Sequence, residues 1–222
     1  MFWNFWVGLA AAMLSTGELA AAAAADASVY QDPETGFTFS QYAAAYNSNG
    51  ASITFRIAVP SGVQSYTPYD AVLQVVAPND VGWAGLAWGG SMISNPLMAC
   101  WKGYSNNVLV SSRWAKSHTA PTAYTGSTYQ VFRTGTKTNS THWQFTAKCT
   151  GCTSYQGDSG GMRYLSAQGG NRLAFAYSPT KPSNPSSNTS SFGVHEVIGY
   201  WNHDFSSGAN PSFTSLVSKL SA

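Results

Sequence analysis

Charged residues are scarce in this sequence. They make up 9% of its 222 positions, and 11 Lys and Arg against 9 Asp and Glu leave a formal net charge of +2. A chain with so little charge is not held unfolded by self-repulsion. It also lacks clustered Lys and Arg, which argues against a nucleic-acid-binding protein, because such proteins neutralise phosphates with basic clusters.

Long hydrophobic runs are missing beyond the N-terminus, and no lipidation motif ends the chain, so we expect no membrane anchor. Residues 1–25 hold a short apolar run and end in six consecutive alanines, which is typical of a signal peptide rather than of a buried N-terminal helix. We therefore predict a signal peptide at 1–25, a single domain at 26–222, and a secreted, extracellular protein. Glycosylation sequons at Asn139 and Asn188 fit an exported protein.

Only three cysteines are present: Cys100, Cys149 and Cys152. In an oxidising compartment, Cys149 and Cys152 most simply close a small disulfide loop. This pair lacks a second ligand pair for zinc, a βαβ setting for redox chemistry, and the His that would follow it in a c-type haem attachment site. Cys100 lies in an apolar stretch and is expected to be a buried free thiol.

The residues that are abundant point to β-structure. Hydrophobic residues make up 44%, aromatic residues 14%, and there are 21 glycines, a combination typical of short strands and turns. Strict alternation predicts a half-buried strand at 52–59, and further strands are expected at 71–76, 81–88, 108–112, 129–133, 142–148 and 173–177. Since no helices separate them, we predict an all-β, two-sheet antiparallel β-sandwich of the immunoglobulin-like kind.

Two segments depart from the strand pattern. Apolar positions 213, 216, 217 and 220 form a helical stripe, which predicts one short C-terminal helix with Asn210 as its cap and Pro211 at its first position. Residues 178–191 are rich in Pro, Ser and Asn and predict a long exposed loop. Such loops on rigid sandwiches often carry function.

Hydrolytic chemistry finds little support. The letters GDSGG at 157–161 match the nucleophile segment of trypsin-like proteases, but neither His118 nor His142 has the setting of that family's general base, so we expect a Gly-rich turn. No His-x-His or His-Glu-x-x-His motif frames a zinc ion, and no His stands at the expected mature N-terminus for a copper oxygenase. The few carboxylates suggest no glycosidase pair. The sequence predicts no catalytic residue.

Met92 and His195 are the candidate metal ligands. Met92 follows an aromatic strand and two glycines, Gly89 and Gly90, which allow a tight turn or a close approach to a flat ligand. His195 comes just after the polar loop and has apolar neighbours. A thioether and an imidazole form a standard axial pair for haem iron. By spacing alone, the commoner interpretation is that both side chains are simply part of the core.

A series of sequence blocks resembles the secreted b-type cytochrome domain of fungal cellobiose dehydrogenase and the related stand-alone cytochromes. The blocks are 32–39 (DPETGFTF), 75–78 (VVAP), 82–92 (GWAGLAWGGSM), 110–115 (VSSRWA), 121–126 (PTAYTG), 139–143 (NSTHW) and 149–153 (CTGCT). Their order along almost the whole of 26–222 is far more specific than any single block.

The resemblance implies a β-sandwich that binds haem b non-covalently, with Met92 and His195 as the axial ligands of the iron. It also places His118 where the family has a Tyr beside the haem edge. The implied partners are extracellular redox proteins: a flavin dehydrogenase as donor, and copper polysaccharide oxygenases or ferric complexes as acceptors. The best-known members continue into a flavin dehydrogenase domain that these 222 residues lack. We therefore expect a monomeric electron carrier, not an enzyme that oxidises cellobiose.

A second hypothesis is a haem-free β-sandwich that binds carbohydrate through exposed tryptophans. The sequence has eight Trp, but four of them lie in strand-like or apolar contexts and are expected in the core: Trp83, Trp88, Trp101 and Trp143. Binding to insoluble cellulose or chitin would separate the two hypotheses.

Overall fold

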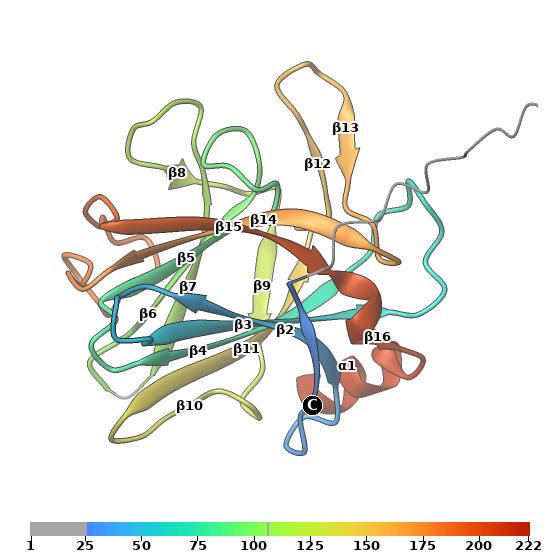
Figure 1. Cartoon of the computed structure of the whole chain (residues 1–222), viewed down its shortest axis with the longest axis horizontal. Helices are drawn as coiled ribbons and strands as arrows, with labels where there is room; N and C mark the ends of the chain where they lie inside the picture. Colours follow the sequence, from blue (N-terminus) through green and yellow to red (C-terminus); the bar gives the residue numbers. More distant parts are fainter. Residues whose placement is uncertain (1–25, 106) are drawn as a thin grey trace, which may run out of the picture.

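The computed structural model describes residues 26–105 and 107–222, so the predicted signal peptide lies outside the described residues. Two β-sheets stack on each other, and the short C-terminal helix packs at one side of the larger sheet (Figure 1). All strand pairs within the sheets are antiparallel except one short parallel pair. This is the two-sheet β-sandwich predicted from the sequence.

The larger sheet has eight strands. In spatial order they are β1 (Ser28–Gln31), β2 (Thr38–Ala45), β3 (Ser52–Pro60), β4 (Ala71–Pro78), β11 (His142–Thr150) and β10 (Lys137–Thr138), while β9 (Thr128–Val131) also pairs with β11 and β16 (Ala209–Asn210) with β3.

The smaller sheet has six strands. Their order is β15 (Val197–Asp204), β14 (Gly170–Ser178), β5 (Trp83–Ala87), β6 (Leu97–Lys102), β7 (Val108–Trp114) and β8 (Thr122–Ala123). A separate hairpin of β12 (Ser154–Gln156) and β13 (Met162–Tyr164) rises on the same side as the β7–β8 connection (Figure 1). The loop of this hairpin is the GDSGG segment, which forms the predicted turn, closed by a hydrogen bond from Gly157 N to Gly161 O at 2.9 Å.

The core follows the alternation read from the sequence. On β3, Ile53, Phe55 and Ile57 are fully buried between the sheets, whereas Arg56 points to the outer face of its sheet. Cys149 and Cys152 form the predicted disulfide, and Cys100 is the predicted buried free thiol. Burial raises the pKa of the Cys100 thiol, which keeps it protonated and inert.

The C-terminal helix forms, but it begins later than predicted. Helix α1 spans Phe213–Ser221 and Ser212 occupies its cap position, so the prediction that Asn210 caps it and Pro211 starts it is wrong. The Asn210 side chain instead pairs with β2: it accepts from Thr38 N at 2.9 Å and donates to Thr38 O at 2.8 Å. This tertiary pairing fixes 209–210 as a strand, and the helix starts beyond Pro211. Its apolar stripe then packs against Phe37 and Phe39.

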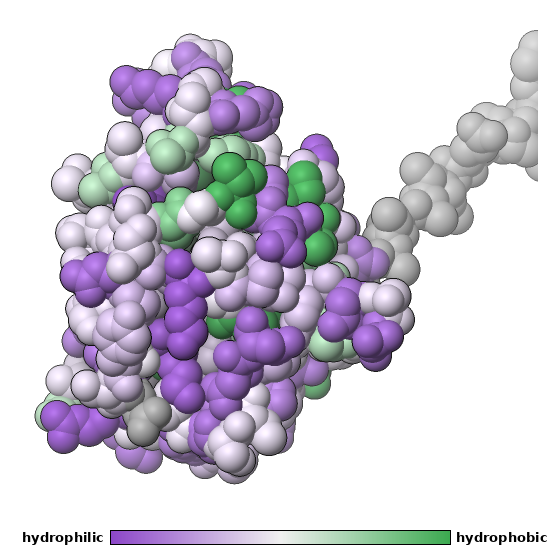
Figure 2. All heavy atoms as spheres, turned by 90° about the vertical axis from the view of Figure 1, so that its left-hand side faces the viewer, coloured by the Kyte–Doolittle hydropathy of each residue, from purple (hydrophilic) through white to green (hydrophobic). Residues whose placement is uncertain are grey.

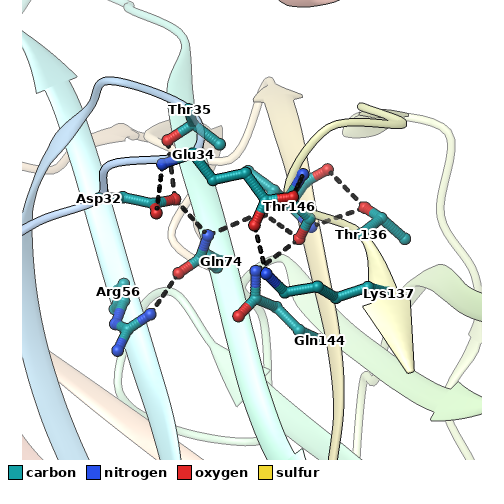
Figure 3. Close-up of polar contacts among 10 residues, drawn as sticks. Asp32, Glu34, Thr35, Arg56, Gln74, Thr136, Lys137, Gln144 and Thr146 are labelled. Carbon is teal, nitrogen blue, oxygen red and sulfur yellow. Dashed lines mark hydrogen bonds and ion pairs between the residues drawn. The ribbon is translucent and has the colours of Figure 1, made fainter. Parts of the chain in front are cut away.

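A buried polar network braces the outer face of the larger sheet (Figure 3). The Asp32 carboxylate, 6% exposed, accepts from Thr35 Oγ1 at 2.8 Å and from Gln74 Nε2 at 3.0 Å. Gln74 Nε2 also donates to Thr146 Oγ1, and Gln74 Oε1 accepts from the Arg56 guanidinium at 2.6 Å. The Gln74 amide therefore links a cation to a buried carboxylate. Because its members satisfy one another, the network stabilises this sheet.

His203 is fully buried on β15 and is held in its neutral form. Its Nδ1 accepts from Trp201 Nε1 at 2.8 Å, and its Nε2 lies 3.1 Å from the Ser40 carbonyl oxygen. Burial lowers the pKa of His203 from 6.5 to about 4, although the Ser40 carbonyl and Asp204 oppose this shift. An imidazole that is neutral in the folded state and titrates near 6.5 when unfolded links stability to pH.

We expect His203 to contribute about 3 kcal/mol of stability above pH 6.5 that is lost as the pH falls toward 4, because the unfolded chain takes up a proton that the folded chain refuses. Urea unfolding between pH 7 and pH 4 should therefore show a shallower pH dependence for His203→Gln than for the wild type. His142→Gln, on the exposed end of β11, is the matched control. Equal pH slopes for His203→Gln and the wild type would contradict the assignment.

Candidate functional site

The outer face of the smaller sheet carries a floor of apolar and mostly small side chains. Strand register places them in two adjacent rows, Leu97–Ala87–Ala174 and Ala99–Gly85–Ala176, on the three strands β6, β5 and β14. Neighbouring strands lie about 4.8 Å apart, so this apolar strip is about 10 Å wide. Arg113 and Tyr200 stand at the two ends of the first row, and Ser111 and Ile198 at the two ends of the second.

Met92 lies against one end of this floor. It is half-buried in the loop that follows β5, and it packs against the cluster formed by Ala87, Leu97 and Ala174 of the first row together with Ala115 beyond β7. The loop turns tightly at Gly90, whose φ is +72° and where an added Cβ would lie 2.7 Å from the Arg172 carbonyl oxygen. The two glycines therefore allow the tight turn that the sequence predicted.

Asn95 holds the Met92 loop in shape. Its side chain is 2% exposed; Oδ1 accepts from Gly89 N at 2.8 Å, and Nδ2 donates to the carbonyls of Ser91 at 2.6 Å and Ile93 at 3.1 Å. These three bonds close the loop around Met92 from inside. Because a buried amide is costly to leave unpaired, they also restrict where the thioether can point.

His195 lies toward the other end of the floor. It is half-buried, three residues after Phe192, whose ring packs on Trp83 at 4.8 Å and on Trp101 at 6.2 Å between centroids. One residue after His195, Glu196 N donates to Tyr177 O at 2.8 Å and starts the pairing of β15 with β14. Met92 therefore packs against the first row of the floor, and Phe192, which anchors the His195 loop, packs against the second row and the two tryptophans beyond it.

The exposed loop predicted at 178–191 lies within an irregular segment at 179–196, apart from Ser178, which ends β14, and only part of this segment is exposed. Pro182, Pro185 and Ser190 are buried, and the Pro185 carbonyl accepts from Trp101 Nε1 at 3.0 Å. The segment covers Trp83 and Trp101 on the outer face of the smaller sheet. Both tryptophans are buried, as predicted, but beneath this loop rather than between the sheets.

His118 is exposed in the β7–β8 connection, three residues after the Ala115 that packs with Met92.

Beside the Met92 loop lies a hollow of about 370 Å³ between residues 89–95 and the β12–β13 hairpin, where Ser94 Oγ bonds to Asp158. Figure 2 shows apolar side chains gathered in the upper half of one face of the molecule, the half that holds the smaller sheet. The exposed apolar residues of β15 and the loop before it are Val194, Ile198 and Tyr200.

The predicted metal ligands are thus brought to one surface, and the sequence alone missed the residues that support them. Among the described residues no group of three or more His, Cys, Asp or Glu could hold a bare metal ion. Asn95, Arg113 and Phe192 were not singled out, because their roles depend on contacts that only the folded chain makes. The floor left a signal: Gly or Ala recurs at alternate positions in two strands, at 85 and 87 and at 174 and 176, and Ala99 stands in the strand beside them.

Comparison with known sequences identifies the family. Residues 30–215 match the family described as the cytochrome domain of cellobiose dehydrogenase. The chain belongs to this family. Residues 30–215 are therefore a cytochrome domain, a type of electron-transfer domain.

Individual relatives of this cytochrome domain support the same family assignment. The chain is 29% identical over 176 residues to a pyrroloquinoline quinone-dependent pyranose dehydrogenase from Coprinopsis cinerea, and the match spans 79% of this chain but only 23% of that relative. The cytochrome b domain of pyranose dehydrogenase from Coprinopsis cinerea has the same fold, with a TM-score of 0.73 and 24% identity over 87% of this chain and 95% of that domain. The cytochrome domain of Myriococcum thermophilum cellobiose dehydrogenase also matches, with a TM-score of 0.77 and 22% identity over 89% and 97%.

The residues of this cytochrome domain fit a haem. The floor is apolar and made mostly of small side chains, which leaves room above it for a macrocycle between Met92 and the His195 loop, and the soft neutral donor set of one thioether and one imidazole suits haem iron. Three buried side-chain groups of the described residues have no hydrogen-bond partner: Tyr69 Oη, Trp83 Nε1 and Trp143 Nε1. Of these, the Trp83 indole N–H lies next to the floor, where a polar group of a bound cofactor could accept from it.

Proposed function

We propose that this domain binds haem b without a covalent link on the outer face of the smaller sheet, with Met92 and His195 as the axial ligands, and carries single electrons between extracellular redox partners. The observation that carries the proposal is the small-residue floor with Met92 at one end and the His195 loop at the other. Membership in the cytochrome-domain family supplies the kind of cofactor.

Haem b, when bound, supplies reversible one-electron exchange at its iron. Met92 and His195 would fill both axial positions, leaving no open site for a substrate. A thioether on one side raises the reduction potential relative to two imidazoles. Asn95 holds the Met92 loop from inside, and the sandwich fixes β5 and β14 beneath, so the ligands would move little when the charge changes. His118 would lie at the rim, where the family has a Tyr.

The proposed setting is extracellular. The Cys149–Cys152 disulfide suits an oxidising compartment, and the sequons at Asn139 and Asn188 lie on exposed loops where glycans could be attached. In the described part of the chain, no helix has the length and apolar character needed to cross a membrane. Proposed donors are sugar dehydrogenases that use flavin or, as in the relative's name, pyrroloquinoline quinone. Copper polysaccharide oxygenases or ferric complexes are the proposed acceptors of a monomeric carrier.

The carbohydrate-binding alternative gains no support from the described residues. Trp83, Trp88, Trp101, Trp143 and Trp201 are each at most 4% exposed. Trp114 is half-buried between Tyr124 and Tyr155. The described part of the chain thus offers no fully exposed tryptophan for stacking on a sugar.

The purified protein, expressed with a haem supply, should show the sharp reduced-state bands of a low-spin b-type haem in a reduced-minus-oxidised spectrum. Stopped-flow mixing with a flavin or quinone sugar dehydrogenase and its sugar should then reduce it, and a dehydrogenase without sugar is the matched control. A colourless preparation would contradict the proposal that the protein binds haem. A coloured protein that no such dehydrogenase reduces would contradict only the proposed donors.

A further inference from the structure

Arg113 is a buried cation that has only neutral partners. It lies on the outer face of β7 in the same row as Leu97, Ala87 and Ala174, and it is 7% exposed. Among the described residues the ion pairs are Lys137 with Glu34 and Lys148 with Asp70, so no carboxylate compensates Arg113. Burying a guanidinium costs free energy unless its N–H groups donate hydrogen bonds, so the acceptors of Arg113 indicate its role.

The Arg113 guanidinium holds the loop that carries His195. One of its terminal amino groups donates to the carbonyl oxygens of Ser190 at 2.7 Å and Asn188 at 3.3 Å, and its Cζ lies 5.2 Å from the centre of the Phe192 ring. Its Nε donates to Ser111 Oγ at 2.7 Å, which fixes the side chain on its own strand. The fork geometry of Arg thus joins β7 to two backbone carbonyls and a ring within seven residues of His195.

We infer that Arg113 is the positioning residue for His195, and that its uncompensated charge also favours the reduced state of a redox group on this face. The first role rests on its bonds to the loop, because a loop that is free to move lets an iron ligand dissociate. The second follows from electrostatics: adding an electron beside a fixed positive charge inside a protein is favourable. Both roles rest on the proposed function, since they concern His195 as a ligand.

The experiment compares Arg113→Met and Arg113→Lys with the wild-type haem protein. In Arg113→Met we expect haem transfer to excess apomyoglobin to become about tenfold faster or more, the cost typical of losing a group that orients a metal ligand. Amide hydrogen exchange in 183–196 should accelerate, and the reduction potential should fall. Arg113→Lys keeps the charge but lacks the planar fork, so exchange and haem transfer should still be faster while the potential stays near the wild-type value.

Two further variants separate the effect of fixing the loop from the effect of the Arg113 charge. Trp101→Phe removes the neutral bond to the Pro185 carbonyl on the same loop, so it should accelerate loop exchange without lowering the potential. Arg133→Met removes an exposed charge in the connection after β9 and should change neither quantity. Circular dichroism and the unfolding midpoint verify that each variant is folded, and Arg113→Lys serves if Arg113→Met does not fold.

Loop exchange and haem transfer within twofold of wild type in a folded Arg113 variant would overturn the positioning role. An unchanged potential in Arg113→Met would overturn the electrostatic role. If the wild type lacks a low-spin haem, or if His195→Ala leaves it intact, the proposed function itself fails. That result is distinguishable, because the exchange of the 183–196 amides is measured in either case.

Discussion

Replacing His195 by alanine is expected to remove most of the haem from the purified protein. An imidazole nitrogen binds ferric and ferrous iron well, whereas the thioether that would remain is a weak ligand, especially for ferric iron. Losing a group that only orients a metal ligand costs about 10–100-fold in affinity, so losing the proposed ligand itself should cost about 100-fold or more. The measurement is the haem content per protein after gel filtration, taken from the pyridine haemochrome spectrum.

The fold should survive this substitution. The anchors on either side of His195, the Phe192 ring on Trp83 and the Glu196 N–H on Tyr177 O, do not involve the imidazole. His142→Ala, an exposed histidine on the larger sheet, is the matched control and should keep full haem content. His118→Ala tests the rim position and should also keep the haem, because a rim contact does not bind iron. Full haem content in His195→Ala would assign the iron ligand elsewhere.

The sequence predicted the sandwich because alternation in a half-buried strand is a local property. Ile53, Phe55 and Ile57 are buried because every second side chain of a strand faces the same side of its sheet. The same alternation is the pattern that predicted this strand from the sequence. One strand without such a contrast was missed. β6 (Leu97–Lys102) is apolar on both faces because one face meets the core and the other lies beneath the loop at 179–196.

Contacts between distant segments account for what the sequence could not predict. Asn210 is a good helix cap by type, yet its two bonds to Thr38, 172 residues away in sequence, keep it in a strand. The loop at 179–196 has the composition of an exposed loop, yet Pro182 and Pro185 are buried in it. Composition reports how a segment behaves alone, whereas register and long-range pairing decide what it covers.

The residues of the candidate site likewise fall into two groups, those that the sequence could identify and those that only the folded chain reveals. Met92 and His195 were identified from the blocks that resemble a known family, together with the glycines before Met92. Asn95 and Arg113, which support the two ligand loops, are ordinary polar residues in the sequence. Their importance comes from burial, 2% and 7% exposed, combined with bonds to loop carbonyls. A sequence pattern contains the ligands but not the groups that hold them.

Replacing Met92 is expected to change the iron without removing it. Met92→His should keep a low-spin haem but lower its reduction potential by roughly 0.1 V or more, because a second imidazole stabilises the ferric state more than a thioether does. Onward electron transfer to an acceptor should slow accordingly. Met92→Ala should open a coordination position and give a high-spin or water-ligated iron. Visible spectra of both oxidation states and a redox titration measure these effects.

The structure also limits which other methionine could be the iron ligand if Met92 is not. If Met92→Ala leaves the spectra of both oxidation states unchanged, Met92 is not a ligand, and another methionine of the domain must be considered. Met98 is 1% exposed and packs in the core between the sheets, on the opposite face of β6 from the small-residue floor, so it is not available to a haem on the outer face. Met162 is 51% exposed on the β12–β13 hairpin and is the remaining candidate among the described residues. Met162→Ala therefore serves as the matched control: it should leave both spectra unchanged if Met92 is the ligand, and it should open the coordination position if Met92 is not.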